Sequence, residues 1–378
     1  MDFEPNDTQR LVQHTARSFA QQHILPEAAA IDREERFPRE QLEGLAALGL
    51  MAVNVAPELG GAGAGAVAYA LAMMEVAKAC ASTAVTMAVT NMVGEVIAKF
   101  GTPAQAERYC PRLADGTFFA GAFALSEPEA GSDPGAMRTT ARKVDGGWIL
   151  DGQKQWITSG AQAGVYVTWA RTGGPGTSGI SCFLVPGGAP GLSVGKHEDK
   201  MGLRGSNTSS LVYDGVKVDD DALLGELGGG FKIAMMALDG GRIGISAQAI
   251  GIATAALEES IAYAKDRKQF GHPLGDFQAI QWMIADSKAE LEAARLLCLR
   301  AATMKERGVP FSKEASMSKV YSTEAANRIC NRAVQIHGGY GYTREFAAER
   351  HLRDVRVTTI YEGTSQVQRL VIARSALK

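Results

Sequence analysis

The sequence of 378 residues contains little cysteine, and its cysteines follow neither a disulfide nor a metal-binding pattern. They are odd in number, scattered, and form no C-x-x-C pair: Cys80, Cys110, Cys182, Cys298 and Cys330. Scattered cysteines of this kind are typical of a reducing compartment and argue against zinc and iron–sulfur sites. The 6 histidines are likewise isolated from one another and from the cysteines, so the sequence predicts no metal site.

The sequence also has no excess of one charge and no long apolar run. It carries 39 basic and 41 acidic side chains without a lysine or arginine block, which argues against a nucleic-acid or anionic-membrane partner. Apolar runs such as GAVAYALAMM end well before the ~18 residues that a membrane span needs. The opening stretch MDFEPNDTQRLVQ has acids where a signal peptide has bases. We therefore expect a cytoplasmic protein, or a mitochondrial matrix protein if a transit peptide has been removed.

Three regions of different periodicity follow one another along the chain. From Thr8 to about Ala114, apolar residues recur three and four apart, which is typical of helices. Short β-rich runs such as VYVTWA and ISCFLV follow, with a turn predicted at Asp151–Gly152. After about Gly230 the helical period returns. The pattern predicts an α+β multidomain protein with an N-terminal α-helical domain, a middle β domain and a C-terminal helical bundle, at residues 1–118, 119–228 and 229–378.

Several polar loops could carry chemistry. The small residues of FALSEPEAGSD let backbone N–H groups approach an anion or a ring edge, although an ordinary polar turn has the same composition. In WITSG, Trp156 and Thr158 could offer a stacking face and a hydroxyl to a planar cofactor, or Trp156 could belong to the core. In DGGRIGI, Arg242 follows paired glycines at a predicted helix start and could bind an anion or be an ordinary surface arginine.

One carboxylate, Glu362, stands between a tyrosine and a glycine in TIYEGTSQVQRL. Ser365 to Gln368 fits a capping box, so the last helix is predicted to start at about Gln366. A glutamate close to that N-terminus is favoured by the helix dipole by roughly 0.3–1 kcal/mol. Its position and neighbours leave two interpretations open, a structural carboxylate or a base.

Seven motifs, taken in order, resemble those of the acyl-CoA dehydrogenases: FALSEPEAGSD, WITSG, DKMGLRGSNT, ALDGGRIGI, RKQFG, QIHGGYGY and YEGTSQVQRL. The resemblance covers nearly the whole chain. It implies a helical N-terminal domain, a middle β-barrel or sandwich domain and a C-terminal four-helix bundle. It further implies an FAD flavoprotein, usually a homotetramer built as a dimer of dimers, that oxidises an acyl-CoA to the trans-2-enoyl-CoA and passes electrons to an electron-transfer flavoprotein.

The same resemblance implies that Glu362 is the base that removes the α-proton while the β-hydrogen leaves as hydride to flavin N5. The charge that grows on the thioester oxygen then meets the backbone N–H of the base residue and a flavin ribityl hydroxyl. A dry pocket would raise the pKa of this carboxylate and the helix N-terminus would lower it, so the net direction stays open. Some relatives, including those for isovaleryl or long-chain substrates, carry the catalytic glutamate beside the arginine of GGRIGI; that place is Gly241 here.

The remaining site residues are also implied by the resemblance. For FAD they are Phe123, Ala124, Leu125, Ser126, Glu127, Pro128, Glu129, Ala130, Gly131, Ser132, Trp156, Ile157, Thr158, Arg267, Phe270, Gln278, Gln335, Ile336, His337, Gly338, Gly339, Thr364, Ser365 and Gln366, some of them from a neighbouring subunit. For the CoA thioester they are Ser132, Asp239, Gly240, Gly241, Arg242 and Gly363. Two positions depart from the common pattern: Glu129 replaces a small residue and Ser159 an asparagine, and the added charge of Glu129 leaves the CoA affinity open.

The segments ALDGGRIGISAQAIGIA and EASMSKVYSTEAANR look most similar to the short-chain and short-branched members of the family. Two other functions have to be distinguished from dehydrogenation. One is an oxidase on the same scaffold that gives its electrons to oxygen. The other is a non-catalytic helical scaffold that binds lipid or CoA without performing chemistry.

Overall fold

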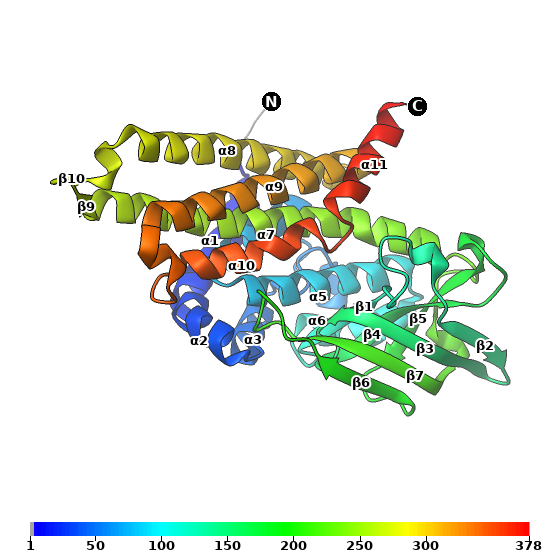
Figure 1. The fold of residues 1–378 in the computed structure, drawn as a ribbon. Helices are drawn as coiled ribbons and strands as arrows, with labels where there is room; N and C mark the ends of the chain where they lie inside the picture. Colours follow the sequence, from blue (N-terminus) through cyan, green and yellow to red (C-terminus); the bar gives the residue numbers. More distant parts are fainter. Residues whose placement is uncertain (1–3, 378) are drawn as a thin grey trace.

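The computed structural model describes residues 4–377, and in it a sheet lies at one end of a long helical body (Figure 1). The predicted order of helices, strands and helices is confirmed. The chain begins with helices α1 (Asp7–Phe19), α2 (Ala28–Glu34), α3 (Arg39–Ala47), α4 (Gly65–Ala79), α5 (Ala81–Phe100) and α6 (Pro103–Ala114). By length and hydropathy α5 could span a membrane, but 89% of its apolar stretch is buried inside the protein, so core packing accounts for its composition.

The middle third of the chain forms an eight-stranded sheet in the order β6-β7-β3-β2-β4-β5-β8, with β1 parallel to β4. Alternating burial along β7 follows the period of two that places one strand face on the core. The strands are β1 (Ala120–Ala124), β2 (Thr140–Val144), β3 (Gly147–Thr158), β4 (Ala163–Arg171), β5 (Ile180–Pro186), β6 (Leu192–His197), β7 (Thr208–Asp219) and β8 (Leu223–Leu224).

The turn predicted at Asp151–Gly152 is wrong. This dipeptide lies inside β3, where Gly152 has φ +145° and the pairing with β7 shifts register. The turn between β2 and β3 is instead Asp145–Gly146, six residues earlier. Both places have an Asp-Gly pair, and only cross-strand pairing decides which of them reverses the chain.

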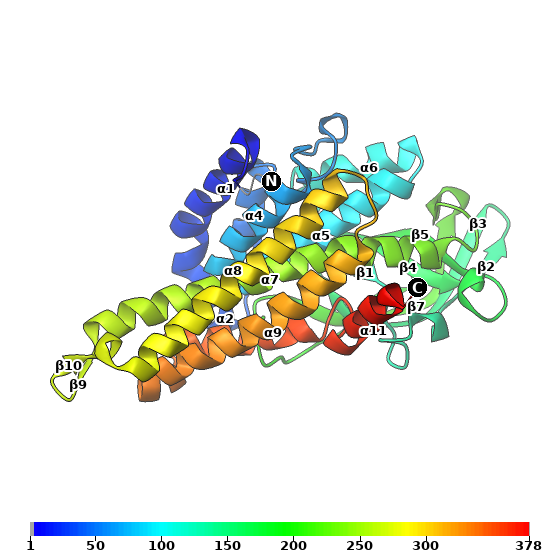
Figure 2. The same cartoon turned by 90° about the horizontal axis from the view of Figure 1, so that it is seen from above.

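The last third returns to helices, most of them long. They run side by side in Figure 2, and a small hairpin of β9 and β10 joins α7 to α8. The elements are α7 (Gly230–Asp266), β9 (Lys268–Gln269), β10 (His272–Pro273), α8 (Gln278–Glu306), α9 (Ser312–His337), α10 (Ala348–Arg356) and α11 (Ser365–Ala376).

The two helical regions share one core. Buried side chains from α4, α7 and α8 belong to the same hydrophobic cluster, among them Tyr69, Ile243 and Cys298. Helices α4 and α7 approach closely at Gly251, where the absence of a side chain permits the contact. A Cβ atom there would lie 2.4 Å from the carbonyl oxygen of Met74. The N-terminal helix α4 therefore packs directly against α7, and any site along this side of α7 is bounded by α4.

Candidate functional site

Glu362 lies in the short loop between α10 and α11, in a backbone conformation that few residues adopt. Its φ is +55°, and that of Gly363 is +87°. Positive φ at a non-glycine residue costs energy and is enriched at functional sites. The following helix is capped by Thr364, whose hydroxyl accepts a hydrogen bond from the Val367 N–H at 3.2 Å. The prediction of a Ser365 cap is therefore wrong by one residue, because α11 begins at Ser365 itself.

Two side chains from the helices fix this loop. Lys319 of α9 is fully buried, and its Nζ donates to the carbonyl oxygen of Gly363 at 2.7 Å. Gln368 of α11 donates from Nε2 to the same oxygen at 2.9 Å and to the Glu362 carbonyl oxygen at 3.3 Å. The loop carbonyls are thus held by the protein, and the Glu362 carboxylate is left for other contacts.

The carboxylate of Glu362 is desolvated and poorly satisfied. Its Oε2 atom is buried and has no hydrogen-bond partner among the described residues. Burial raises the pKa of Glu362 to about 7, against the opposing charges of Lys319 and Arg242. The sequence left open whether the pKa of Glu362 is raised or lowered. It is raised, because desolvation outweighs the nearby cations and the helix N-terminus.

The motif around Arg242 lies in the middle of α7. Arg242 is therefore not at a helix start, and it is buried, so the interpretation as a surface arginine is also wrong. Its Nη1 contacts Asp239 Oδ1 at 2.5 Å and Ser316 Oγ at 3.2 Å. A Cβ atom at the neighbouring Gly241 would lie 2.6 Å from Glu362 Oε2, so this position has no room for a side chain while Glu362 points at it.

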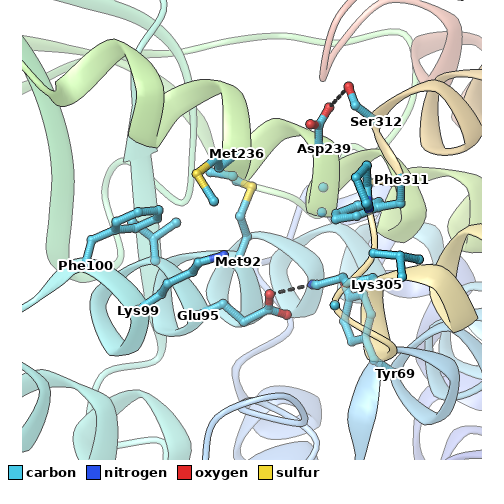
Figure 3. Close-up of a pocket in the computed structure, with 17 residues that line it drawn as sticks. Tyr69, Met92, Glu95, Lys99, Phe100, Met236, Asp239, Lys305, Phe311 and Ser312 are labelled. Atoms are coloured by element: carbon cyan, nitrogen blue, oxygen red, sulfur yellow. Dashed lines mark hydrogen bonds and ion pairs between the residues drawn. The ribbon is translucent and has the colours of Figure 1, made fainter.

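A cavity of about 550 Å³ lies beside this carboxylate, between α4, α5, α7 and the loop from α8 to α9 (Figure 3). Asp239, Gly240 and Gly241 line it from α7, and Gly241 is the residue that faces Glu362. Its other walls come from residues that the sequence did not single out: Tyr69, Met92, Glu95, Lys305 and Phe311. The Lys305 ammonium and the Glu95 carboxylate pair across it at 2.5 Å. These residues are far apart in the chain, and no local pattern marks them.

The loop after β1 and the end of β3 form a second polar region. Trp156 is 60% exposed with φ +63°, so it is not a core tryptophan, whereas Ile157 beside it is buried. From the first loop, the chain exposes Pro128, Glu129, Gly131 and Ser132. The added charge of Glu129 meets Arg138 at 2.8 Å.

Glu127 differs from the other residues of this loop, because its carboxylate is turned inward. It accepts a hydrogen bond from Lys154 Nζ at 2.8 Å and from the backbone N–H groups of Arg138 and Thr139 at 2.6 and 3.0 Å. Lys154 also donates to the carbonyl oxygen of Leu125 at 3.2 Å. The side chain of Glu127 therefore shapes the loop, with its carboxylate held by groups of the protein itself.

The remaining predicted cofactor residues divide between two distant places. Thr364, Ser365 and Gln366 adjoin Glu362 at the start of α11. Arg267, Phe270, Gln278 and the segment Gln335–Gly339 belong to the β9–β10 hairpin and the helix ends near it, which lie at the end of the helices opposite the sheet (Figures 1 and 2). There the Arg267 guanidinium lies 5.4 Å from the ring centre of Tyr340, and Phe270 is 90% exposed. One chain therefore does not bring this group to Trp156.

The fold and the site together define an enzyme in which a buried carboxylate with a raised pKa lies against Gly241, a residue that lines a substrate-sized cavity. Three family models match consecutive parts of the chain: the acyl-CoA dehydrogenase N-terminal domain at 6–117, the middle domain at 122–216 and the C-terminal domain at 228–377. The chain belongs to the acyl-CoA dehydrogenase family, and the prediction of an acyl-CoA dehydrogenase enzyme with this fold is confirmed.

Individual relatives are similar over almost their whole length. The short-chain specific acyl-CoA dehydrogenase of Bos taurus is 49% identical over 98% of this chain and 90% of its own. The structure of butyryl-CoA dehydrogenase from Megasphaera elsdenii matches with TM-score 0.98 at 42% identity, covering 100% of both chains. A chain from the structure described as the electron transferring flavoprotein of Acidaminococcus fermentans matches with TM-score 0.99 at 40% identity, again over 100% of both.

The protein is an FAD flavoprotein, as members of this family are. The FAD complex of the structural neighbour PigA illustrates this; it matches with TM-score 0.96 at 29% identity, covering 100% of this chain and 99% of that one. The residues present fit this cofactor. The indole of Trp156 is exposed and contacts no other aromatic ring of residues 4–377, so its face is available for stacking. A Cβ atom at Gly131 would meet nothing within 4 Å, which leaves open space along the first loop.

Proposed function

We propose that this protein oxidises a short-chain acyl-CoA thioester to its trans-2-enoyl-CoA, with Glu362 as the base that removes the α-proton. One observation carries this proposal: the Glu362 carboxylate is buried against Gly241 of the cavity lining, its Oε2 has no hydrogen-bond partner within residues 4–377, and its pKa is raised to about 7. A general base works best when its pKa lies near the working pH, because it is then ionised and still basic. A structural carboxylate would instead have its oxygens paired.

The backbone next to the base offers the second group that proton abstraction needs. Among the described residues, no hydrogen bond uses the backbone N–H of Glu362, although its carbonyl oxygen accepts from Gln368. A free N–H at this position can donate to the thioester oxygen as negative charge develops there. When bound, FAD accepts the hydride that leaves the β-carbon. The chain itself supplies the carboxylate, the N–H and a buried surrounding that excludes water.

The substrate class follows from the cavity and from the relatives. A cavity of about 550 Å³ beside Glu362 must hold an acyl group and part of a CoA arm, which leaves space for a short chain. Relatives specific for short-chain and butyryl substrates match nearly all of the chain. An electron-transfer flavoprotein as the acceptor is supported by the Acidaminococcus fermentans structure.

The separation of the cofactor residues supports a shared site. Trp156 lies in β3 of the sheet, whereas Arg267 adjoins the β9–β10 hairpin at the end of the helices away from the sheet, so one FAD can meet both only if Arg267 comes from a second copy of this chain. The exposed Phe270 on the same hairpin is suited to such a contact, because a large apolar side chain gains from burial between subunits. We infer a homo-oligomer, built as the dimer of dimers that the sequence predicted.

Replacement of Glu362 by glutamine tests this function directly. Glu362→Gln keeps the shape of the side chain and removes its basicity, so we expect a folded, yellow protein whose oxidation of butyryl-CoA falls by several orders of magnitude, beyond the ~10²–10⁴ of acid–base assistance alone. Anaerobic bleaching of the flavin by butyryl-CoA measures the loss. A variant that keeps a tenth of the wild-type rate removes the proposed role of Glu362.

The same assay separates the two rival functions. Rapid production of H2O2 from butyryl-CoA in air, without another acceptor, would indicate an oxidase. A colourless protein that takes up no added FAD would indicate the non-catalytic scaffold. Bleaching of the flavin by butyryl-CoA, followed by slow reoxidation of the reduced flavin in air, supports the dehydrogenase.

A further inference from the structure

The cavity beside Glu362 has both exposed and buried lining residues. Its open side is marked by Lys99, which is exposed, by Met236, which is 37% exposed, and by Val309 of the loop from α8 to α9, which is 41% exposed. At the other end, Tyr69 of α4 lines the cavity with only 5% of its surface exposed, surrounded by the helical core (Figure 3). Because CoA is much larger than a short acyl group, it must occupy the open side, and the acyl tail must point toward Tyr69.

The positions of glycines on α7 give the distance from Glu362 to Tyr69 along the helix axis. A Cβ atom at Gly240 would lie 3.2 Å from Lys305 Nζ, and one at Gly241 would lie 2.6 Å from Glu362 Oε2. At Gly244 the nearest atom is the Tyr69 hydroxyl, again at 2.6 Å. Residues three apart share a helix face and are separated by about 4.5 Å along the axis. The ring of Tyr69 therefore closes the cavity within one helical turn of the base.

This spacing sets a length for the acyl group. The α-carbon must lie against the Glu362 carboxylate, and the rest of the chain extends from there toward Tyr69. An extended chain of ~1.5 Å bonds advances roughly 1.3 Å for each bond, so roughly three bonds fit beyond the α-carbon. Butyryl and pentanoyl groups fit this space, and the sixth carbon of a hexanoyl group meets the ring.

We propose that Tyr69 is the end wall of the acyl pocket and limits the substrate to about five carbons. The inference rests on the proposed function and adds the residue that sets the chain length. The ring is suited to this role because it belongs to a packed core cluster shared by α4, α7 and α8, which leaves it little freedom to move aside. Its hydroxyl has no hydrogen-bond partner among the described residues, and burial keeps the pKa of this phenol well above its usual value, so a neutral ring faces the acyl tail.

The test is a panel of butyryl-, pentanoyl-, hexanoyl- and octanoyl-CoA, read as kcat/KM with the FAD-loaded enzyme. For wild type we expect a fall of at least tenfold between pentanoyl and hexanoyl. Tyr69→Ala opens the end wall, and each newly buried methylene adds about fourfold to binding. The ratio of octanoyl to butyryl should therefore rise at least tenfold in this variant. Tyr69→Phe keeps the ring and should keep the wild-type ratio, which separates the size of the side chain from its hydroxyl.

Tyr69→Leu, with a smaller loss of volume, replaces Tyr69→Ala if the alanine variant does not fold with FAD. If the octanoyl-to-butyryl ratio of kcat/KM is unchanged in a flavin-loaded Tyr69→Ala or Tyr69→Leu variant, the proposed role of Tyr69 is contradicted, whereas the proposed dehydrogenation is not. Wild-type enzyme that oxidises octanoyl-CoA as well as butyryl-CoA overturns it without any variant. Wild-type flavin that no acyl-CoA of the panel bleaches contradicts the proposed function instead.

Discussion

At the scale of single residues, the charge on Glu362 depends on groups from two helices. Burial raises the pKa of its carboxyl, and the cations that oppose this shift are Lys319 on α9 and Arg242 on α7. Arg242 is itself paired with Asp239, so much of its charge is already compensated. Lys319 has no carboxylate within ion-pair distance among the described residues, and burial lowers the pKa of its ammonium to about 7, with Glu362 opposing that shift. Lys319 therefore both supports the loop and provides the largest electrostatic effect of a nearby charge on the proposed base.

Lys319→Met should move the pH dependence of the reaction. The proposed base is ionised above its pKa, so kcat/KM of the wild type should rise with pH through about 7. Without the nearby cation the carboxylate is harder to ionise, and the rising limb moves to higher pH. A shift of ~1 unit, at the lower end for loss of a close opposite charge, would cut the ionised fraction at pH 7 from roughly a half to roughly a tenth. The measurement is the pH profile of butyryl-CoA oxidation.

Lys313→Met is the matched control for this substitution, because Lys313 lies on the same helix but is 44% exposed at its side chain and pairs with Glu314. It should keep the wild-type profile. A Lys319→Met enzyme with an unmoved limb would show that Lys319 acts only as a structural support.

At the scale of elements, a buried ion pair fastens the loop after β1 to β3. Lys154 is fully buried on β3, and Glu127 in the loop is 6% exposed. Burial lowers the pKa of Lys154 to about 8, while Glu127 opposes this shift. Burial alone would raise the pKa of Glu127, but the Lys154 charge and the Arg138 N–H outweigh it and lower the pKa. Each charge is thus stabilised by the other, and the two segments that carry the proposed flavin contacts are held together.

Lys154→Met should destabilise the protein and release FAD. The substitution leaves the Glu127 carboxylate buried without its cation, which costs about 3–5 kcal/mol when a buried pair is broken. Thermal unfolding and the flavin absorbance that remains after gel filtration measure the two effects. The double variant Lys154→Met with Glu127→Gln removes both charges and should recover part of the stability. Full flavin retention in the single variant would contradict this role of the pair.

At the scale of the whole molecule, the residues proposed to bind FAD lie in distant parts of one chain. The β9–β10 hairpin and the sheet are separated by the length of the helices (Figure 1). If two copies complete each site, an inactive Arg267→Ala chain and an inactive Glu362→Gln chain can still form one intact site between them. Random pairing makes half of the dimers mixed, and one of the two sites in each is intact, so the mixture should recover about a quarter of wild-type activity.

The measurement is the activity of co-expressed or co-refolded Arg267→Ala and Glu362→Gln chains, compared with each variant alone. Arg267→Ala by itself should lose FAD on gel filtration, because its guanidinium is part of the proposed cofactor contact. A mixture no more active than the separate variants, or an Arg267→Ala protein with full flavin content, would contradict a site shared in this way.

The sequence by itself determined the order of helices, strands and helices, because periodicities of 3.6 and 2 are local properties of a chain. Through the resemblance of its motifs it also predicted that Glu362 is the base. It placed the turn at the Asp-Gly pair 151–152, whereas the chain turns at 145–146, since strand pairing selects the turn. It could not settle the pKa of Glu362, because desolvation depends on which helices cover the loop. Tyr69 was part of the apolar run GAVAYALAMM, which gave no sign of a site. Only the packing of α4 against α7 brings it to the closed end of the cavity, since contacts between distant segments have no local signature.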